Sequence, residues 1–134
     1  SGIFLLGLAG NDPEKSRSHA VESAKLINRM APPMPRKWYI SPLTLEMTPG
    51  SEILAQNLEK KFQPCTSTHI LEELYALIGN TADDLTDCIF NTNHASNYLS
   101  LKGELGKDKK DFLCRVEAGI KDPAVRRPEC MRGL

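Results

Sequence analysis

The sequence predicts an α/β fold with about three parallel strands and flanking helices, in the order β-α-β-α-α-β-α. Short apolar runs alternate with longer segments in which apolar residues recur every three to four positions. The longer segments are bounded by residues typical of helix starts and stops. This alternation favours parallel strands joined by helical crossovers.

The first predicted strand is the continuous apolar run from Ile3 to Leu8, as expected for a strand covered on both faces. A helix should follow from Asp12, which can cap free N–H groups, and Pro13, whose missing donor costs nothing there. The proline-rich segment 31–35 should end this helix. Its predicted inward face is Ala20, Val21, Ala24, Ile27 and Met30.

The second predicted strand runs from about Lys37 to Glu46. Pro42 lacks an N–H group, so we expect it at a sheet edge or a bulge. Ser51 should cap a helix over residues 52–61, which Pro64 ends. We expect the apolar side chains of that helix to point inward: Ile53, Leu54 and Leu58.

The remaining elements continue the alternation. Thr66 to Thr68 should cap a helix that closes at Gly79-Asn80, and its predicted core face is Ile70, Leu71, Leu74, Leu77 and Ile78. A third strand covers Cys88 to Phe90 and can extend to Asn91. A long polar loop, 92–106, and a helix over 107–120 follow, and that helix groups Phe112, Leu113, Val116 and Ile120.

Length and charge favour a single ordinary domain. The chain has 134 residues, and 17 basic residues balance 17 acidic ones. This balance offers no direct indication of nucleic-acid binding, and no apolar run approaches the roughly 20 residues of a membrane span. We expect the folded domain over residues 1–121 and an irregular tail over 122–134. The tail arginines could clamp an anion or dock the tail by ion pairs.

The cysteine pattern indicates free thiols. Cys65, Cys88, Cys114 and Cys130 form no C-x-x-C pair, and the three histidines lie far apart in the sequence. The chain alone therefore predicts no metal site and no iron–sulfur cluster. Free thiols are typical of a cytoplasmic protein, which is the expected localisation.

Three loop segments follow predicted strands, where parallel α/β folds bind ligands. The first, Gly7 to Asp12, runs into a helix N-terminus, but it lacks a complete dinucleotide or Walker pattern and could be a tight turn. The second, Glu46 to Ser51, reads as a turn plus a cap that explains every residue except Glu46.

The third segment, Asn91 to Tyr98, is the richest in polar groups. It holds three asparagines, His94 and several hydroxyls directly after an apolar strand. It is either a solvated loop or a polar wall around a small ligand. No order of Ser, His and Asp or of Cys and His predicts nucleophilic catalysis.

Several pieces of the chain, in order, resemble one family. They are Leu6–Gly10, Ser18–Asn28, Leu43–Gly50, Ile70–Leu74, Asn91–Leu99 and Arg127–Leu134. Together they resemble the carboxyl-terminal half of radical S-adenosylmethionine proteins, in the elongator-like, coproporphyrinogen-oxidase-like subset of Fe–S oxidoreductases. The run Asn-His-Ala-Ser-Asn-Tyr-Leu is the most specific piece, whereas the Pro-Gly turn is common in that superfamily.

The resemblance implies part of a TIM-like (β/α)6 barrel. The family carries a C-x-x-x-C-x-x-C motif for a [4Fe–4S] cluster that binds S-adenosylmethionine and reduces it to a 5′-deoxyadenosyl radical, and this chain lacks that motif. By position, the S-adenosylmethionine side would be formed by Gly7, Leu8, Ala9, Gly10, Thr48, Pro49 and Gly50. The substrate side would be formed by Asn91, Asn93, His94 and Asn97.

The resemblance also implies a partner. The chain opens like the middle of a longer protein, so we expect the missing N-terminal half of the barrel to pair with it and to hold the cluster and cofactor. Open sheet edges predict pairing between copies of the isolated chain. The alternative is a stand-alone small-ligand-binding or interaction module without catalysis.

Overall fold

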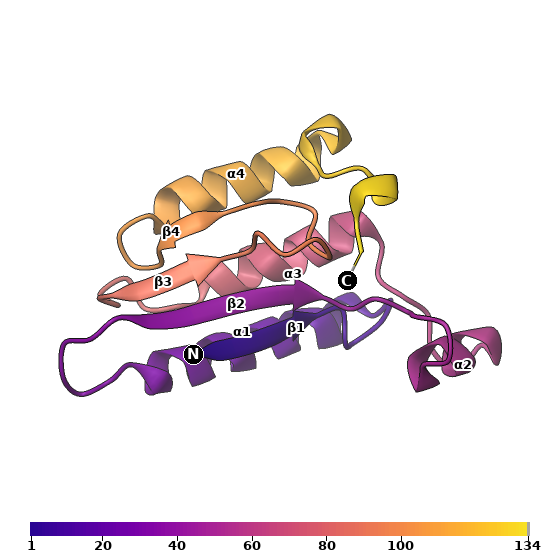
Figure 1. Ribbon diagram of the computed structural model, residues 1–134, viewed down its shortest axis with the longest axis horizontal. Helices are drawn as coiled ribbons and strands as arrows, with labels where there is room; N and C mark the ends of the chain where they lie inside the picture. The colour runs from indigo at the N-terminus through magenta and orange to yellow at the C-terminus, as the bar shows by residue number, and fades with distance from the viewer. Residues whose placement is uncertain (134) are drawn as a thin grey trace.

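A computed structural model describes residues 1–133 and shows a four-stranded open sheet flanked by helices (Figure 1). The strands are β1 (Gly2–Leu6), β2 (Trp38–Thr44), β3 (Cys88–Asn91) and β4 (Lys102–Glu104), in that spatial order. The first three strands are parallel, and β4 is antiparallel to β3. The α/β class and the three parallel strands are confirmed, whereas the fourth strand makes the sheet mixed.

Strand β4 corrects the prediction of a continuous polar loop over 92–106. Its sequence, Lys-Gly-Glu, has no apolar alternation and gives no strand signal. Pairing with β3 forms it, since Asn91 faces Lys102 and Ile89 faces Glu104 across the ladder. The chain therefore reverses direction at residues 92–101 and forms a second sheet edge at β4.

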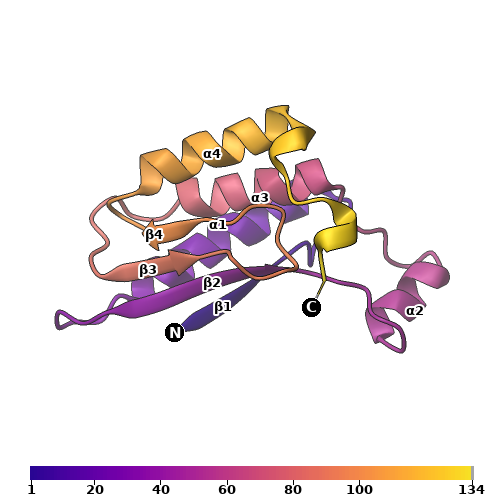
Figure 2. The same ribbon diagram turned by 45° about the horizontal axis from the view of Figure 1, so that its top comes forward.

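The helices are α1 (Pro13–Met30), α2 (Glu52–Leu58), α3 (Ser67–Gly79) and α4 (Lys109–Lys121). Helices α1, α3 and α4 form one layer on the same face of the sheet (Figure 2). The core lies between this layer and the sheet, and its centre is fully buried: Ala24, Ile27, Ile40, Ile78, Phe90, Leu101, Leu105 and Val116.

The predicted caps of α1 and α3 are confirmed, and the predicted core faces of the three helices are largely confirmed. The Asp12 side chain accepts a hydrogen bond from the backbone N of Lys15, 3.1 Å away, and Pro13 occupies the first turn. Thr66 caps α3 in the same way through the backbone N of His69. All five predicted core residues of α3 are buried.

Helix α2 corrects the prediction for residues 52–61. Ser51 caps it as expected, but it ends at Leu58, and Lys60 follows with φ of 61°. The helix projects away from the sheet (Figure 1), and Leu58, predicted inward, is 75% exposed. Its apolar spacing describes an amphipathic helix, but the described residues place no core beneath it.

Pro42 lies in an interior strand, not at an edge or a bulge as predicted. It pairs with Phe4 of β1, but β3 pairs with β2 only over Trp38 to Ile40. Pro42 therefore lies beyond the ladder on the β3 side, where a missing N–H is tolerated. Its carbonyl oxygen instead accepts a hydrogen bond from the Asn97 side chain at 2.7 Å.

The second face of the sheet has no helix over it in residues 1–133 (Figure 2). Its side chains are mostly apolar, and Ile3 is 72% exposed and Tyr39 49% exposed. The ladders place Leu5 opposite Leu43 and Tyr39 opposite Ile89 on this face. The prediction that these strands are covered on both faces is therefore met on one face within the described chain.

The tail contains two short 3₁₀ turns, Pro123–Val125 and Glu129–Met131, separated by extended residues. Leu134, the last residue of the predicted tail, lies outside the described residues. Within the described part of the chain, no helix is both long enough and apolar enough to cross a membrane.

Candidate functional site

The carboxyl ends of the three parallel strands bring the three predicted loop segments to one edge of the sheet. Gly7 follows β1, residues 45–50 follow β2, and Thr92 follows β3. The backbone N of Leu45 donates to the Leu6 carbonyl, and the backbone N of Thr44 donates to the Ser96 hydroxyl at 3.2 Å. The edge is therefore one connected structure rather than three separate loops.

The loop after β1, residues 7–10, is held from within the protein. Gly7 has φ of 91° and Gly10 has φ of 65°, which favour glycine at both ends. The Gly7 amide donates to the Glu73 carboxylate at 2.9 Å, and the Gly10 carbonyl accepts from the Cys65 thiol. Leu8, half exposed, and Ala9 form the outward tip of the loop.

The segment after β2 contains the predicted turn and cap. The Ser51 hydroxyl donates to the Thr48 carbonyl at 2.7 Å and accepts from the backbone N of Leu54. Gly50 has φ of 80°, and a side chain there would meet nothing within 4 Å. Thr48, Pro49 and Gly50 thus lie at the surface, and Pro49 and Gly50 are exposed.

Asn97 anchors the loop after β3. Its side-chain nitrogen donates to the carbonyls of Pro42 and Thr92, at 2.7 and 3.0 Å, and its oxygen accepts from the Thr44 hydroxyl at 3.0 Å. The residue is 3% exposed. Among the predicted substrate-side residues, Asn97 therefore supports the loop from inside, whereas Asn93 and His94 are exposed.

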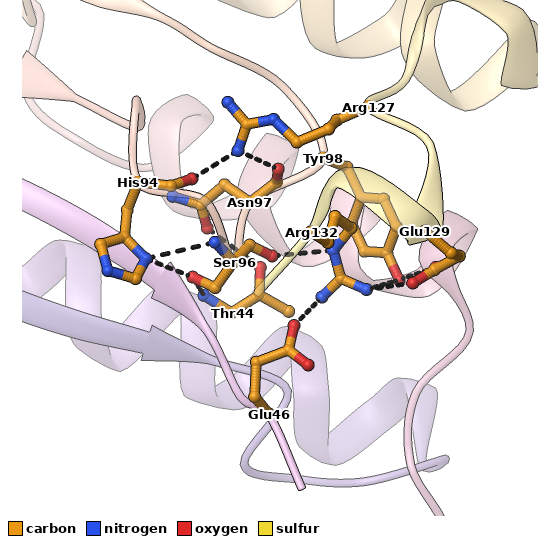
Figure 3. A network of polar contacts seen from close by, with 9 residues as sticks. All are labelled: Thr44, Glu46, His94, Ser96, Asn97, Tyr98, Arg127, Glu129 and Arg132. Atoms are coloured by element: carbon orange, nitrogen blue, oxygen red, sulfur yellow. Dashed lines mark hydrogen bonds and ion pairs between the residues drawn. The ribbon is translucent and has the colours of Figure 1, made fainter. Parts of the chain in front are cut away.

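The ring of His94 has a defined orientation. Its Nδ1 accepts from the backbone N of Ser96 at 3.2 Å and lies 2.9 Å from the Ser96 hydroxyl, which itself accepts from Thr44 (Figure 3). Because Nδ1 is an acceptor, a neutral ring carries its proton on Nε2. Nε2 points away from this network, so His94 offers an N–H donor at the sheet edge (Figure 3).

The tail fastens the loop from outside. The Arg127 guanidinium donates to the carbonyls of His94 and Asn97, and its backbone N donates to the Tyr98 carbonyl at 2.7 Å. Arg132 donates to the Ser96 carbonyl and pairs with Glu129 at 2.6 Å. Of the two roles left open for the tail arginines, docking of the tail is the one the structure shows (Figure 3).

Arg132 is the centre of this network. Its side chain is 8% exposed, forms an ion pair with Glu46 and lies 3.9 Å from the centre of the Tyr98 ring. Burial and the hydrogen bond to Glu129 raise the pKa of Tyr98, so its hydroxyl stays protonated and donates. Glu46, which the turn-and-cap interpretation left unexplained, is the acceptor that ties β2 to the tail.

Glu73 is a residue of this edge that the sequence reasoning missed. It lies on the buried face of α3, between Ile70 and Leu74. A carboxylate inside an otherwise apolar helical face was the available signal, since buried charged groups require partners. The partners come from the first loop and from α1, which local periodicity cannot reveal.

The cysteines do not form a cluster site. Cys88 is buried in β3, and the Cys65 thiol donates a hydrogen bond to the Gly10 carbonyl. Cys114 and Cys130 are exposed. Within residues 1–133, no group of three or more His, Cys, Asp or Glu side chains could hold a metal ion. These residues do not fit a [4Fe–4S] cluster, so no chemical step is assigned to one on this chain.

A cavity of about 490 Å³ lies in the helix layer, between α1 and α3. Its polar lining includes Arg17, His69, Glu72 and Tyr75. This cavity provides a second location against which a ligand site at the sheet edge can be tested.

A comparison of the chain with known protein families, with curated proteins and with solved structures gives no match.

Proposed function

We propose that this chain forms the carboxyl-terminal part of a radical S-adenosylmethionine barrel of the Fe–S oxidoreductase type. In this role it supplies the S-adenosylmethionine-side and substrate-side walls of the site. The proposal rests on the resemblance quoted above and on the arrangement of the sheet.

One observation carries the proposal. Strands β1, β2 and β3 lie side by side in chain order, and α1 and α3, which lie between them in the chain, cover the same face. This arrangement is the one expected of a barrel wall, whereas a doubly wound sheet has helices on both faces. In a barrel, the carboxyl ends of the strands face the ligand, and here they carry the three predicted segments.

The uncovered sheet face supports a partner. Strand β1 is an edge, and Ile3, Leu5 and Leu43 lie on the face that no described helix covers. Apolar side chains in a row on a sheet are stabilised when a second layer removes them from water. The partner in this proposal is the N-terminal half of the barrel, which carries the cluster motif.

The residues of this chain have separate roles in the proposal. The tip at Leu8–Ala9 and the turn at Thr48–Gly50 line the adenosyl side through backbone and apolar contacts. His94 donates its Nε2–H to an acceptor oxygen of the substrate, with Asn91 and Asn93 beside it. The role of all these residues is to bind and orient, because the cluster belongs to a motif outside this chain.

A stand-alone small-ligand-binding or interaction module is the second candidate. It is favoured by the internal completeness of the fold, since residues 1–133 contain no buried side-chain N or O atom without a hydrogen-bond partner. This candidate predicts that the chain alone binds its ligand, whereas the barrel proposal needs the full gene product.

The test is equilibrium binding of S-adenosylmethionine to the full gene product and to residues 1–134 alone. Leu8→Arg places a bulky cation at the loop tip and should weaken binding at least roughly tenfold. Leu26→Arg is the matched control, since Leu8 is 50% exposed and Leu26, near the far end of α1, is 51% exposed.

The barrel proposal predicts binding by the full gene product, loss in Leu8→Arg and normal affinity in Leu26→Arg. Full affinity in Leu8→Arg, or a full gene product without the C-x-x-x-C-x-x-C motif, would contradict it. A small ligand bound by residues 1–134 alone would favour the second candidate.

A further inference from the structure

Glu73 is a buried carboxylate on which three donors from other parts of the chain converge. Its residue exposure is 2%, and its side chain is fully buried. Oε2 accepts from the Gly7 amide at 2.9 Å and from the Ser16 hydroxyl at 3.1 Å, and Oε1 lies 2.7 Å from Nδ1 of His19. The carboxylate thus joins α3, α1 and the loop after β1.

The arrangement accounts for a carboxylate at this position. A carboxylate offers acceptors on both oxygens, and all three of its partners can donate. His19 must carry a proton on Nδ1 to do so, and its side chain is 33% exposed. Burying such a group without these partners would be strongly unfavourable, so the three contacts belong together.

Nucleophilic chemistry does not explain this cluster. Ser16, His19 and Glu73 are the residue types of a hydrolase triad, but the hydroxyl of Ser16 donates to the carboxylate rather than to the imidazole. In a triad the imidazole stands between the hydroxyl and the carboxylate. The arrangement therefore does not activate the Ser16 hydroxyl as a nucleophile, and instead holds the three groups in place.

What Glu73 holds is the start of the proposed ligand loop. Gly7 lies so close to α3 that a Cβ on it would come within 2.9 Å of Ile70 Cδ1. At the other end, the Asn11 amide donates to the Gln63 carbonyl at 2.7 Å, and Cys65 bonds to Gly10. The first end of the loop 7–10 is thus held by α3, and the second end by the segment between α2 and α3. The tip of the loop faces outward.

We infer that Glu73 is a positioning residue that sets the shape of the loop 7–10, with His19 orienting its carboxylate. The inference rests on the proposed function in that the loop it shapes is the proposed S-adenosylmethionine wall. Ligand contacts made by Leu8 and Ala9 then depend on a residue that touches no ligand.

Glu73→Gln tests the inference, with the exposed Glu72→Gln on the same helix as control. If the glutamine oxygen stays on Gly7 and Ser16, its NH₂ group faces His19, and the His19 proton must move to Nε2. Nitrogen-15 spectra of the chain should show this change of tautomer. The Gly7 amide should exchange with solvent roughly tenfold faster, because it loses a charge-assisted bond.

The functional arm is S-adenosylmethionine affinity in the full gene product. We expect Glu73→Gln to weaken it roughly tenfold and Glu72→Gln to leave it unchanged. If Glu73→Gln fails to fold, His19→Ala replaces it, since removing a partly exposed ring should still accelerate Gly7 exchange several-fold.

The outcomes separate this inference from the proposed function. Unchanged Gly7 exchange and an unchanged His19 tautomer would overturn the inference. A perturbed Gly7 with full affinity for S-adenosylmethionine would overturn the positioning role. In a third outcome, Glu73→Gln accelerates Gly7 exchange while the wild-type protein binds no S-adenosylmethionine. That result would support the contact between Glu73 and the loop and would overturn the proposed function.

Discussion

The loops after β1 and after β3 lie at the same edge of the sheet but are held in different ways. The loop 7–10 is held from inside, by the buried carboxylate of Glu73 at Gly7 and by the Cys65 thiol at Gly10. The loop 92–98 is anchored from inside by Asn97, and Arg127 and Arg132 of the tail add several further contacts from outside. A buried charged anchor is costly to lose, whereas a network of several contacts loses less with each one.

The largest expected effect is the loss of the buried anchor. Glu73→Leu leaves the Gly7 amide, Ser16 and His19 without their acceptor. We expect the free energy of unfolding to fall by about 2–4 kcal/mol in urea denaturation. Glu72→Leu, an exposed change on the same helix, should stay within about 0.5 kcal/mol. Equal losses in the two variants would contradict the role of Glu73 as the buried anchor.

The two loops should also differ in thiol chemistry. The Cys65 thiol donates a hydrogen bond to Gly10 in the loop 7–10, and burial raises the pKa of Cys65 to about 11. Cys130, in contrast, lies exposed in the tail. At pH 8, Cys65 should react with a disulfide reagent roughly a hundredfold more slowly than Cys130, since the thiolate is the nucleophile.

Two further thiols calibrate that measurement. Cys114 is exposed and should react like Cys130, whereas burial raises the pKa of Cys88 to about 12 and makes it the slowest. Peptide mapping of the labelled sites assigns each rate. Fast labelling of Cys65 would show that the loop 7–10 opens readily.

The tail network should show a smaller loss of stability. Arg132→Ala removes the ion pairs with Glu46 and Glu129 and the contact with the Tyr98 ring. We expect a loss of about 1–2 kcal/mol by urea denaturation. Arg115→Ala, which removes one exposed bond to Ser100, is the control. A loss as large as that of Glu73→Leu would mean that the two loops do not differ in kind.

The smallest effect on stability is expected at His94. Its ring is exposed, so His94→Ala should change the free energy of unfolding by no more than about 0.5 kcal/mol. In the full gene product, the same substitution should lower substrate binding or turnover, while His69→Ala in the helix layer should not. A large stability loss with normal activity would instead assign His94 a structural role.

The sequence was sufficient for the elements whose signals are local. The cap at Asp12, the core face from Ile70 to Ile78 and the strand at Cys88 needed no tertiary information. Strand β4 and the exposure of Leu58 could not be read, because each depends on what lies beside it in space. Residue periodicity describes a face but not whether anything covers it.

The candidate site likewise has features that the sequence predicted and contacts that it could not predict. Its location at the ends of the strands followed from the order of elements, and its polar loop from composition. Glu46 contacts Arg132, which lies 86 residues away along the chain. Glu73 accepts from Gly7, 66 residues away, and Arg132 donates to Ser96, 36 residues away. Such pairings are invisible to any local pattern, and they decide which side chains support the site and which face a ligand.

Hydrogen exchange of the full gene product, with and without S-adenosylmethionine, tests the central claim most directly. The account predicts that added S-adenosylmethionine protects amides in residues 7–10 and 46–50, at the sheet edge. It predicts no protection in the segments of α1 and α3 that line the cavity of the helix layer. Protection confined to that cavity, or none in either loop, would contradict the claim that this edge is the ligand wall.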